Sequence, residues 1–401
     1  MAGIGVRLNK IYEKNTITTD LYGAGYSIVV TIAPMLVVIA ALIFMEWKLE
    51  FSTLGFAARE LFSCTILYIF IFALLTASPF NSVLSRYMSD VIYEEKYEDI
   101  LPCYYLGLFL NIFLSSLVGI PFCIHEFVVG KVDIIYVFTG YCGYIALVLT
   151  FYSMLYLSIC KDYKKISGFF TLGMIVSALF SLVFRFLLMW SITYSILLAL
   201  TIGFTLIAAL EFSVVRSYFR ENSGQYKKVI RYFKNYWQLV VANFLYILGL
   251  YIHNFVFWTT DLHMTVVKSF VCVTSYDMAS CLAMFTNISA SVIFISRVEM
   301  YFHERYKAYS EAVIGGRGID IEVTKKRMFR LLGSELMSLA RVQFIISLIL
   351  FLICMILLPR FGFGGLTMRI YPGLSAGYFI LFLMYAEIIF LYYFNDLTGA
   401  V

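Results

Sequence analysis

Amide, hydroxyl and carboxyl side chains recur at helical spacing inside the long apolar stretches of this sequence. The residues that stand out in this way are Asn81, Ser85, Asn111, Asn243, His253, Asn254, Asp277 and Asn287. Side chains three, four or seven positions apart share one face of an α-helix. Several such faces favour a shared hydrophilic cavity that could bond a polar cargo. The alternative is that small polar residues simply let helices pack closely.

Four tyrosines form a second pattern, a stripe along a single apolar stretch: Tyr141, Tyr144, Tyr152 and Tyr156. On one helix they cover an arc of about 120° and extend roughly 22 Å along the axis. Such a stripe would suit a sugar polymer, because pyranose rings stack on aromatic faces while their hydroxyls bond phenol oxygens. The alternative is a set of tyrosines that bond neighbouring helices in a dry core.

Two of the charged residues within apolar stretches are further candidates. Arg185 lies near the outer end of its stretch, where it either extends toward the membrane surface or attracts an anionic group. Glu387 lies deeper and is a candidate partner for a cation or a proton. No set of histidine, cysteine and carboxylate has metal-ligand spacing, and the eight cysteines stand singly. The sequence therefore predicts no metal site, no cofactor and no catalytic residues.

The segments that must position these side chains are long and apolar. The chain is 62% apolar and 14% charged, against about 45–50% and about 25% in soluble domains, which excludes a soluble globular protein. Ten runs are long enough to cross a bilayer as helices: 22–45, 61–84, 103–124, 133–158, 167–189, 192–214, 237–258, 277–297, 336–358 and 373–395. They lack the alternation of barrel strands. The predicted fold is an all-α polytopic membrane protein.

Lysine and arginine in short loops predict the orientation of the chain. With the N-terminus in the cytoplasm, 23 of the 30 basic residues fall in cytoplasmic segments and six fall in outer loops. Residues 1–21 are then a cytoplasmic amphipathic N-terminus. The net charge of +5 is explained by this topology and gives no evidence for nucleic-acid binding.

Two long basic loops, 215–236 and 298–335, divide the chain. We expect an N-terminal six-helix lobe at 22–214, a basic cytoplasmic linker at 215–236 and a C-terminal lobe at 237–401 with four helices. Comparing the lengths of the two halves predicts that about two helices of a twelve-helix fold are absent, while Gly315–Gly318 is expected to form a flexible loop. Candidate docking residues for a partner are Arg216, Lys227, Lys228, Arg231, Lys325, Lys326 and Arg327. Anionic lipid headgroups are the alternative partner for these loops.

Motifs along most of the chain carry a family resemblance. They are Met1–Gly5 with Leu8 and Lys10; Ser85–Asp90 with Glu95, Tyr97 and Ile100–Pro102; Tyr246, Gly249, Phe257 and Trp258; Tyr276, Asp277, Glu299, Phe302, Tyr306, Tyr309, Gly315 and Gly316; and Tyr393, Asn395, Asp396 and Gly399. Together they resemble the Pel exopolysaccharide transporters (the PelG family) of the multidrug/oligosaccharidyl-lipid/polysaccharide (MOP) flippase superfamily. One departure is His253-Asn254, where the family often has an acidic–basic pair.

The resemblance implies a two-lobed, twelve-helix flippase in the bacterial cytoplasmic (inner) membrane. Its cargo would be an N-acetylhexosamine-rich exopolysaccharide of the biofilm matrix. Its partners would be a cytoplasmic glycosyltransferase and small membrane subunits, with cyclic-di-GMP acting through a partner.

The leading hypothesis is a non-enzymatic conduit in which the polymer passes between the two halves. One alternative is an ion-coupled flippase for drugs or lipid-linked oligosaccharides, in which Asp277 or Glu387 would bind the ion. The other is a scaffold that only anchors the glycosyltransferase.

Overall fold

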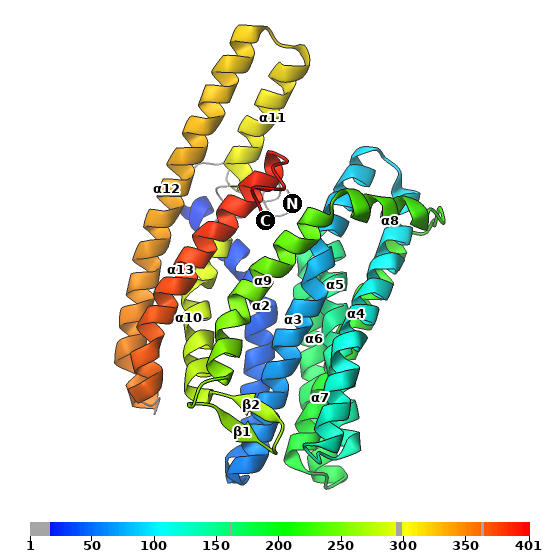
Figure 1. Ribbon diagram of the computed structural model, residues 1–401, viewed down its shortest axis with the longest axis vertical. Helices are drawn as coiled ribbons and strands as arrows, with labels where there is room; N and C mark the ends of the chain where they lie inside the picture. The colour runs from blue at the N-terminus through cyan, green and yellow to red at the C-terminus, as the bar shows by residue number, and fades with distance from the viewer. Residues whose placement is uncertain (1–16, 161, 294–298, 362–364) are drawn as a thin grey trace. The chain divides into compact units, whose positions relative to one another are not determined.

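The chain folds into long helices and one small hairpin (Figure 1). The computed structural model describes residues 17–160, 162–293, 299–361 and 365–401. The first helices are α2 (Ile17–Lys48), α3 (Phe56–Tyr93), α4 (Ile100–Val128), α5 (Ile134–Ile159), α6 (Tyr163–Leu182) and α7 (Ile192–Tyr218). The later ones are α8 (Tyr226–Asn235), α9 (Trp237–Trp258), α10 (Thr274–Ile293), α11 (Glu299–Gly315), α12 (Gly318–Leu357) and α13 (Gly365–Tyr393). The predicted amphipathic N-terminus, 1–21, lies mostly outside the described residues.

Within the described residues, each predicted apolar run lies mainly on a helix. Within the described ranges, eight helices are long and apolar enough to cross a membrane: α3, α4, α5, α6, α7, α9, α12 and α13. The first and eighth predicted runs lie on α2 and α10, which are not among these eight helices. The count of ten spans therefore stays a prediction. Several helices extend well beyond their apolar runs, because helical hydrogen bonding continues through polar turns. The helix α3, for example, has 38 residues.

The prediction of a long loop at 298–335 is wrong, because its described residues, 299–335, lie almost entirely on helices α11 and α12. The helix α11 ends at Gly315, and α12 begins at Gly318, so the glycine stretch is a tight turn and not a flexible loop. A Cβ at Gly316 would meet the carbonyl oxygen of Ala312 at 2.6 Å. Although this segment is hydrophilic overall, its helices have an apolar side. There Phe302 packs with Met328 and Leu339 in one buried cluster.

A two-stranded antiparallel sheet interrupts the otherwise all-helical fold between α9 and α10. The strands are β1 (Met264–Val266) and β2 (Phe270–Cys272), with Val266 opposite Phe270. The turn residues Val267 and Lys268 have positive φ angles of 51° and 62°, which suit a tight hairpin. This segment joins the predicted apolar runs 237–258 and 277–297, and no strand is predicted there from the sequence.

The helices form two compact units, which we describe separately. The larger unit is Ile32–Val273 with Asp396–Val401, and the smaller unit is Thr274–Asn395 with Met1–Thr31. In the larger unit, α5 packs against α3, α4 and α7, while α6 covers α7 and α9 packs on α3. In the smaller unit, α13 packs against α10 and α12, and α11 lies along α12. The lobe boundaries predicted from the sequence stay a prediction.

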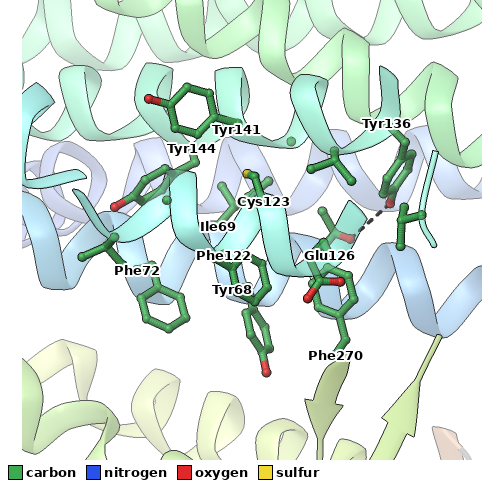
Figure 2. A pocket seen from close by; sticks show the side chains of 16 residues that line it. Tyr68, Ile69, Phe72, Phe122, Cys123, Glu126, Tyr136, Tyr141, Tyr144 and Phe270 are labelled. Atoms are coloured by element: carbon green, nitrogen blue, oxygen red, sulfur yellow. Dashed lines mark hydrogen bonds between the residues drawn. The ribbon is translucent and has the colours of Figure 1, made fainter. Parts of the chain in front are cut away.

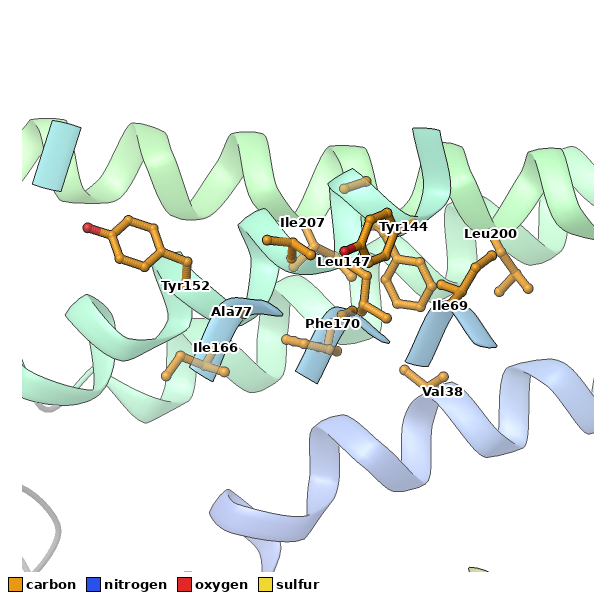
Figure 3. Packing of buried hydrophobic residues seen from close by; sticks show 14 of the residues in the cluster. Val38, Ile69, Ala77, Tyr144, Leu147, Tyr152, Ile166, Phe170, Leu200 and Ile207 are labelled. Atoms are coloured by element: carbon orange, nitrogen blue, oxygen red, sulfur yellow. The ribbon is translucent and has the colours of Figure 1, made fainter. Parts of the chain in front are cut away.

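The core of the larger unit is built from apolar side chains on α3, α5, α6 and α7 (Figure 3). Ile69, Leu147, Phe170 and Ile207 gather there from these four helices. The helices α6 and α7 approach closely because glycines face each other. A Cβ at Gly173 would lie 2.9 Å from the carbonyl oxygen of Gly203. Small residues at such crossings let membrane helices pack backbone to backbone.

We expect Gly173→Ala to lower the free energy of unfolding by about 1–3 kcal/mol, because the added methyl group overpacks this crossing. Gly168→Ala on the same helix is the matched control, since a Cβ there meets nothing within 4 Å. The control should be neutral or stabilising by up to about 1 kcal/mol through helix propensity. Thermal unfolding of the purified protein in detergent measures both. Equal stability of the two variants would contradict the close approach of α6 and α7.

Candidate functional site

The polar face of α3 carries hydrogen-bonding atoms that lack partners. The Oγ of Ser78 and the Oδ1 of Asn81 are buried and have no hydrogen-bond partner among the described residues. Asn243 of α9 donates from its Nδ2 to the backbone carbonyl of Ser78. Ser85, one turn beyond Asn81, is also buried. The structure therefore brings Asn243 to the α3 face and leaves two groups of that face unpaired.

Two further sequence-predicted residues lie on α9. Asn254 is buried and His253 is half-buried, near the end of α9 that leads into the hairpin. Both make interactions within the protein. Neither is part of the contact between Asn243 and Ser78.

The tyrosine stripe of α5 is hydrogen-bonded to its neighbouring helices. The Tyr144 hydroxyl lies 2.9 Å from Thr76 Oγ1 of α3, and Tyr141 lies 2.9 Å from Ser116 Oγ of α4. Tyr152 donates to the carbonyl of Tyr104 (3.0 Å) and lies 2.8 Å from the Tyr156 hydroxyl. These contacts agree with the dry-core alternative, and a role of the stripe in transport stays a prediction.

Asn111 of α4 is fully buried. Its Nδ2 donates to the carbonyl of Gly107 (2.8 Å), while its Oδ1 has no partner among the described residues. Unlike the tyrosines, it thus keeps one free acceptor in the interior of the larger unit.

A cavity of about 220 Å³ lies between α3, α4, α5 and the hairpin. Figure 2 shows its aromatic wall, with Tyr68, Phe122, Tyr136 and Phe270 among the labelled side chains. The wall is almost entirely apolar, which is unsuited to sugar hydroxyls. Its one carboxyl, Glu126, accepts a hydrogen bond from Ser269 of the hairpin loop.

Glu211 of α7 is an acidic residue that is not among the site residues predicted from the sequence. Its side chain is 0% exposed, and neither carboxyl oxygen has a hydrogen-bond partner among the described residues. Its neighbours Ala208 and Phe212 line a second cavity, of about 480 Å³, between α4, α5 and α7. A search for charges inside apolar runs finds Glu211, because it lies within 192–214. An ionisable group at such a place is expensive and marks a functional candidate.

The smaller unit contains a buried polar network centred on Asn287 of α10. Asn287 Nδ2 donates to the carbonyl of Ser375 on α13 (3.2 Å). Its Oδ1 accepts from Ser347 Oγ (2.9 Å) and from Gln343 Nε2 (3.4 Å), both on α12. Two tyrosines of α13 add the contacts Ser280–Tyr378 (2.9 Å) and Thr286–Tyr371 (3.0 Å). The predicted residue Asn287 thus links three helices, through partners that its own stretch of sequence does not contain.

The other predicted residues of the smaller unit behave differently. Asp277 is buried near the start of α10 and makes interactions within the protein. Glu387 is exposed on α13, although it lies well inside an apolar stretch. In the larger unit, Arg185 donates from Nη1 to the carbonyl of Trp190 (3.0 Å). This bond lies at the helix end, and the role of Arg185 stays a prediction.

The basic linker docks onto the turns at one end of the larger unit. Lys228 of α8 forms an ion pair with Asp99 (2.6 Å), and Arg216 donates to the Tyr105 hydroxyl (2.6 Å). Asp162 accepts from Tyr218 and pairs with Lys165 (3.0 Å). Partial burial raises the pKa of Asp162, but the hydrogen bonds from Tyr218 and Lys165 outweigh this effect and hold the pKa below its usual value. Two of the predicted docking residues, Lys228 and Arg216, therefore already contact other residues of the chain.

The remaining docking candidates differ in whether they form an ion pair within the described residues. Lys326 pairs with Glu322 one helical turn away (2.7 Å). Four others are exposed and make no ion pair within the described residues: Lys227, Arg231, Lys325 and Arg327.

Comparisons with known proteins agree with this architecture. The chain matches the family PelG, "Putative exopolysaccharide Exporter (EPS-E)", over residues 1–401. A solved structure of an outward-facing multidrug resistance MATE family transporter of the MOP superfamily gives a TM-score of 0.55 at 13% identity, covering 93% of this chain and 80% of that chain. An inward-facing counterpart gives 0.53 at 14% identity, covering 93% and 83%. At these identities the likeness concerns the fold. Among curated proteins, the chain has no match.

We expect Asn287→Ala to lower the free energy of unfolding by about 2 kcal/mol or more, because buried polar partners left unsatisfied cost about 1–3 kcal/mol each. Ser334→Ala is the control, since Ser334 is exposed on α12 and donates only to the Leu331 carbonyl of its own helix. It should change stability by less than about 0.5 kcal/mol. Denaturant unfolding in detergent compares the two. A neutral Asn287→Ala would show that the network contributes nothing to the fold.

Proposed function

This chain belongs to the PelG family, and we propose that it exports a Pel-type, N-acetylhexosamine-rich exopolysaccharide across the bacterial cytoplasmic membrane. The observation that carries the proposal is the family match over the whole chain. The MOP-type fold and the eight membrane-capable helices are those of a membrane transporter. In the proposed orientation the N-terminus and the α8 end of the larger unit face the cytoplasm, where the polymer is made.

In the larger unit, the proposed contacts for the polymer lie on the polar faces of α3 and α9. In the smaller unit, they lie on the polar face of α10. Ser78 and Asn81 keep unpaired hydrogen-bonding atoms in a buried setting, so they can bond the hydroxyl and acetamido groups of successive sugar residues. Neutral amides and hydroxyls bind such groups one bond at a time, and each net bond is worth only about 0.5–1.5 kcal/mol. A polymer can therefore be held in register and still advance.

A second candidate function is an ion-coupled flippase for drugs or lipid-linked oligosaccharides. The MATE neighbours and the fully buried carboxyl of Glu211 favour it. This function requires an acidic residue that binds a proton or a cation during the cycle, whereas the polysaccharide conduit relies on the neutral polar faces. The two candidates therefore differ in which residues abolish transport.

We expect alanine at Asn81, Asn254, Asp277 or Asn287 to reduce polysaccharide secretion by about tenfold or more at equal membrane level, since about 1.4 kcal/mol changes an equilibrium tenfold. Secreted polymer is measured in a deletion strain that carries each variant, with Ser334→Ala as the control. Immunoblotting of membranes corrects for variants that fold poorly.

Two results would count against the conduit. Normal secretion by all four variants would leave a scaffold for the glycosyltransferase as the better function. Loss confined to Asp277→Ala and to a Glu211→Gln variant, with Asn81→Ala and Asn254→Ala unaffected, would favour the ion-coupled flippase.

We also propose that the cytoplasmic glycosyltransferase docks on the exposed basic residues of α8 and α12, with small membrane subunits as further partners. The support is charge: Lys227 and Arg231 of α8 and Lys325 and Arg327 of α12 are exposed and carry no ion pair among the described residues. Lys228 contributes less, because Asp99 already neutralises it.

The double variant Lys227→Glu/Arg231→Glu should reduce co-purification of the glycosyltransferase by about five- to tenfold, because like charges replace attractive ones across the contact. Lys131→Glu is the matched control. Lys131 is exposed at the opposite end of the larger unit, between α4 and α5, and should leave co-purification unchanged. Unchanged binding by the double variant would assign these residues to lipid headgroups.

A further inference from the structure

Three potential metal ligands converge where α3 meets the hairpin. Glu60 and Cys64 lie four residues apart on one face of α3, and Cys272 ends β2. Each residue offers one ligand atom, and these three atoms, a carboxylate oxygen and two sulfurs, lie within 4.8 Å of one another. Sequence spacing could not reveal this set, because Cys272 is remote from the α3 pair along the chain. The prediction of no metal-ligating set was based on such local spacing.

The hairpin is held in register against α3 by a residue outside the set. Tyr68, one turn after Cys64, donates to the carbonyl of Val271 (2.8 Å) and accepts from its amide (3.2 Å). The Tyr68 ring also stacks on Trp258 with centroids 4.8 Å apart. Glu60, Cys64 and Tyr68 thus form a stripe that faces β2, and the position of Cys272 is fixed by the bonds to its neighbour Val271.

The surroundings of the two thiols separate them from water. Cys64 and Cys272 are each 2% exposed and pack with Val266 and Phe270 in one small apolar cluster. Glu60 is half-buried. Three groups that become anionic on deprotonation repel one another in such a setting, and a divalent cation would neutralise that repulsion.

We propose that Glu60, Cys64 and Cys272 form a three-ligand Zn²⁺ site that fastens the hairpin to α3. Zinc accepts thiolate and carboxylate ligands at about 2.3 Å and about 2.0–2.2 Å, in tetrahedral geometry. Water would take the fourth position on the exposed side of Glu60. The carboxylate makes the set less suited to copper(I), which selects soft sulfur ligands. Through Phe270, two residues before Cys272, the ion would also fix one wall of the cavity in Figure 2.

The test is metal binding by the full-length protein in detergent micelles. After chelation and dialysis, the protein should bind one Zn²⁺ per chain by elemental analysis, and Co²⁺ should give a thiolate-to-cobalt charge-transfer band. Zn²⁺ should raise the thermal midpoint, and EDTA should reverse the rise. Cys64→Ser and Cys272→Ser should each abolish the cobalt band and the zinc-dependent shift.

Two further variants keep the test independent of folding. Glu60→Gln leaves both buried thiols in place and should weaken Zn²⁺ binding more than about tenfold, since even groups outside the ligand shell change affinity about 10- to 100-fold. Cys160→Ser, at the opposite end of the larger unit, is the matched control and should bind Zn²⁺ as the unmodified chain does.

Two outcomes would overturn the proposal. One is a Cys64–Cys272 disulfide, found by mass spectrometry of the protein purified without reductant, since it would consume both thiols. The other is Zn²⁺ binding that is unaffected by Glu60→Gln and by either cysteine variant. Neither outcome bears on export, which is measured by secretion.

Discussion

The structure depends on one constraint, which is that polar groups inside a hydrocarbon layer must find partners within the protein. Threonine and serine hydroxyls of the spans return to their own helices: Thr76 donates to the Phe72 carbonyl and Thr150 to the Ala146 carbonyl. Longer side chains reach across, as Tyr144 does to Thr76 and Asn243 does to Ser78. The same constraint makes the few unpaired atoms informative. Each of them is buried without a hydrogen bond and so lowers the stability of the fold.

The constraint explains which parts of the fold could be predicted from the sequence. A bilayer-crossing helix needs a long uncharged run, so each apolar run could be located without any knowledge of its neighbours. Amphipathic helices outside the membrane have a weaker signal in the sequence. The segment of α11 and the start of α12 contains many charges, and its apolar side is formed by a few residues such as Phe302 and Met328, which pack in one buried cluster. The hairpin is short, and its turn residues Val267 and Lys268 lack the glycine or asparagine that usually signals such a turn.

The candidate site could be predicted only in part, for a related reason. Helical spacing indicates which residues of one span share a face, as for the polar residues of α3 and α10. It contains no information about which face meets which neighbour. Asn287 could be found, but its partners Gln343 and Ser347 on α12 follow from tertiary packing. The tyrosine stripe shows that a regular pattern need not mark a cargo path. Its hydroxyls on α5 bond to α3 and α4.

The state of each polar group also ranks the candidates for transport. A group that binds a moving cargo must exchange its partner at low cost, so a fully bonded hydroxyl inside a close-packed core is a poor choice. Tyr152 and Tyr156 bond each other and the α4 backbone with no exposed surface, and this places them last. The Oδ1 of Asn287 accepts only from the side chains of Gln343 and Ser347 among the described residues, and these can rotate to release it, so Asn287 ranks higher. Asn81 ranks first, because its carbonyl oxygen is buried and has no partner among the described residues, so a sugar hydroxyl would gain a bond there without breaking one.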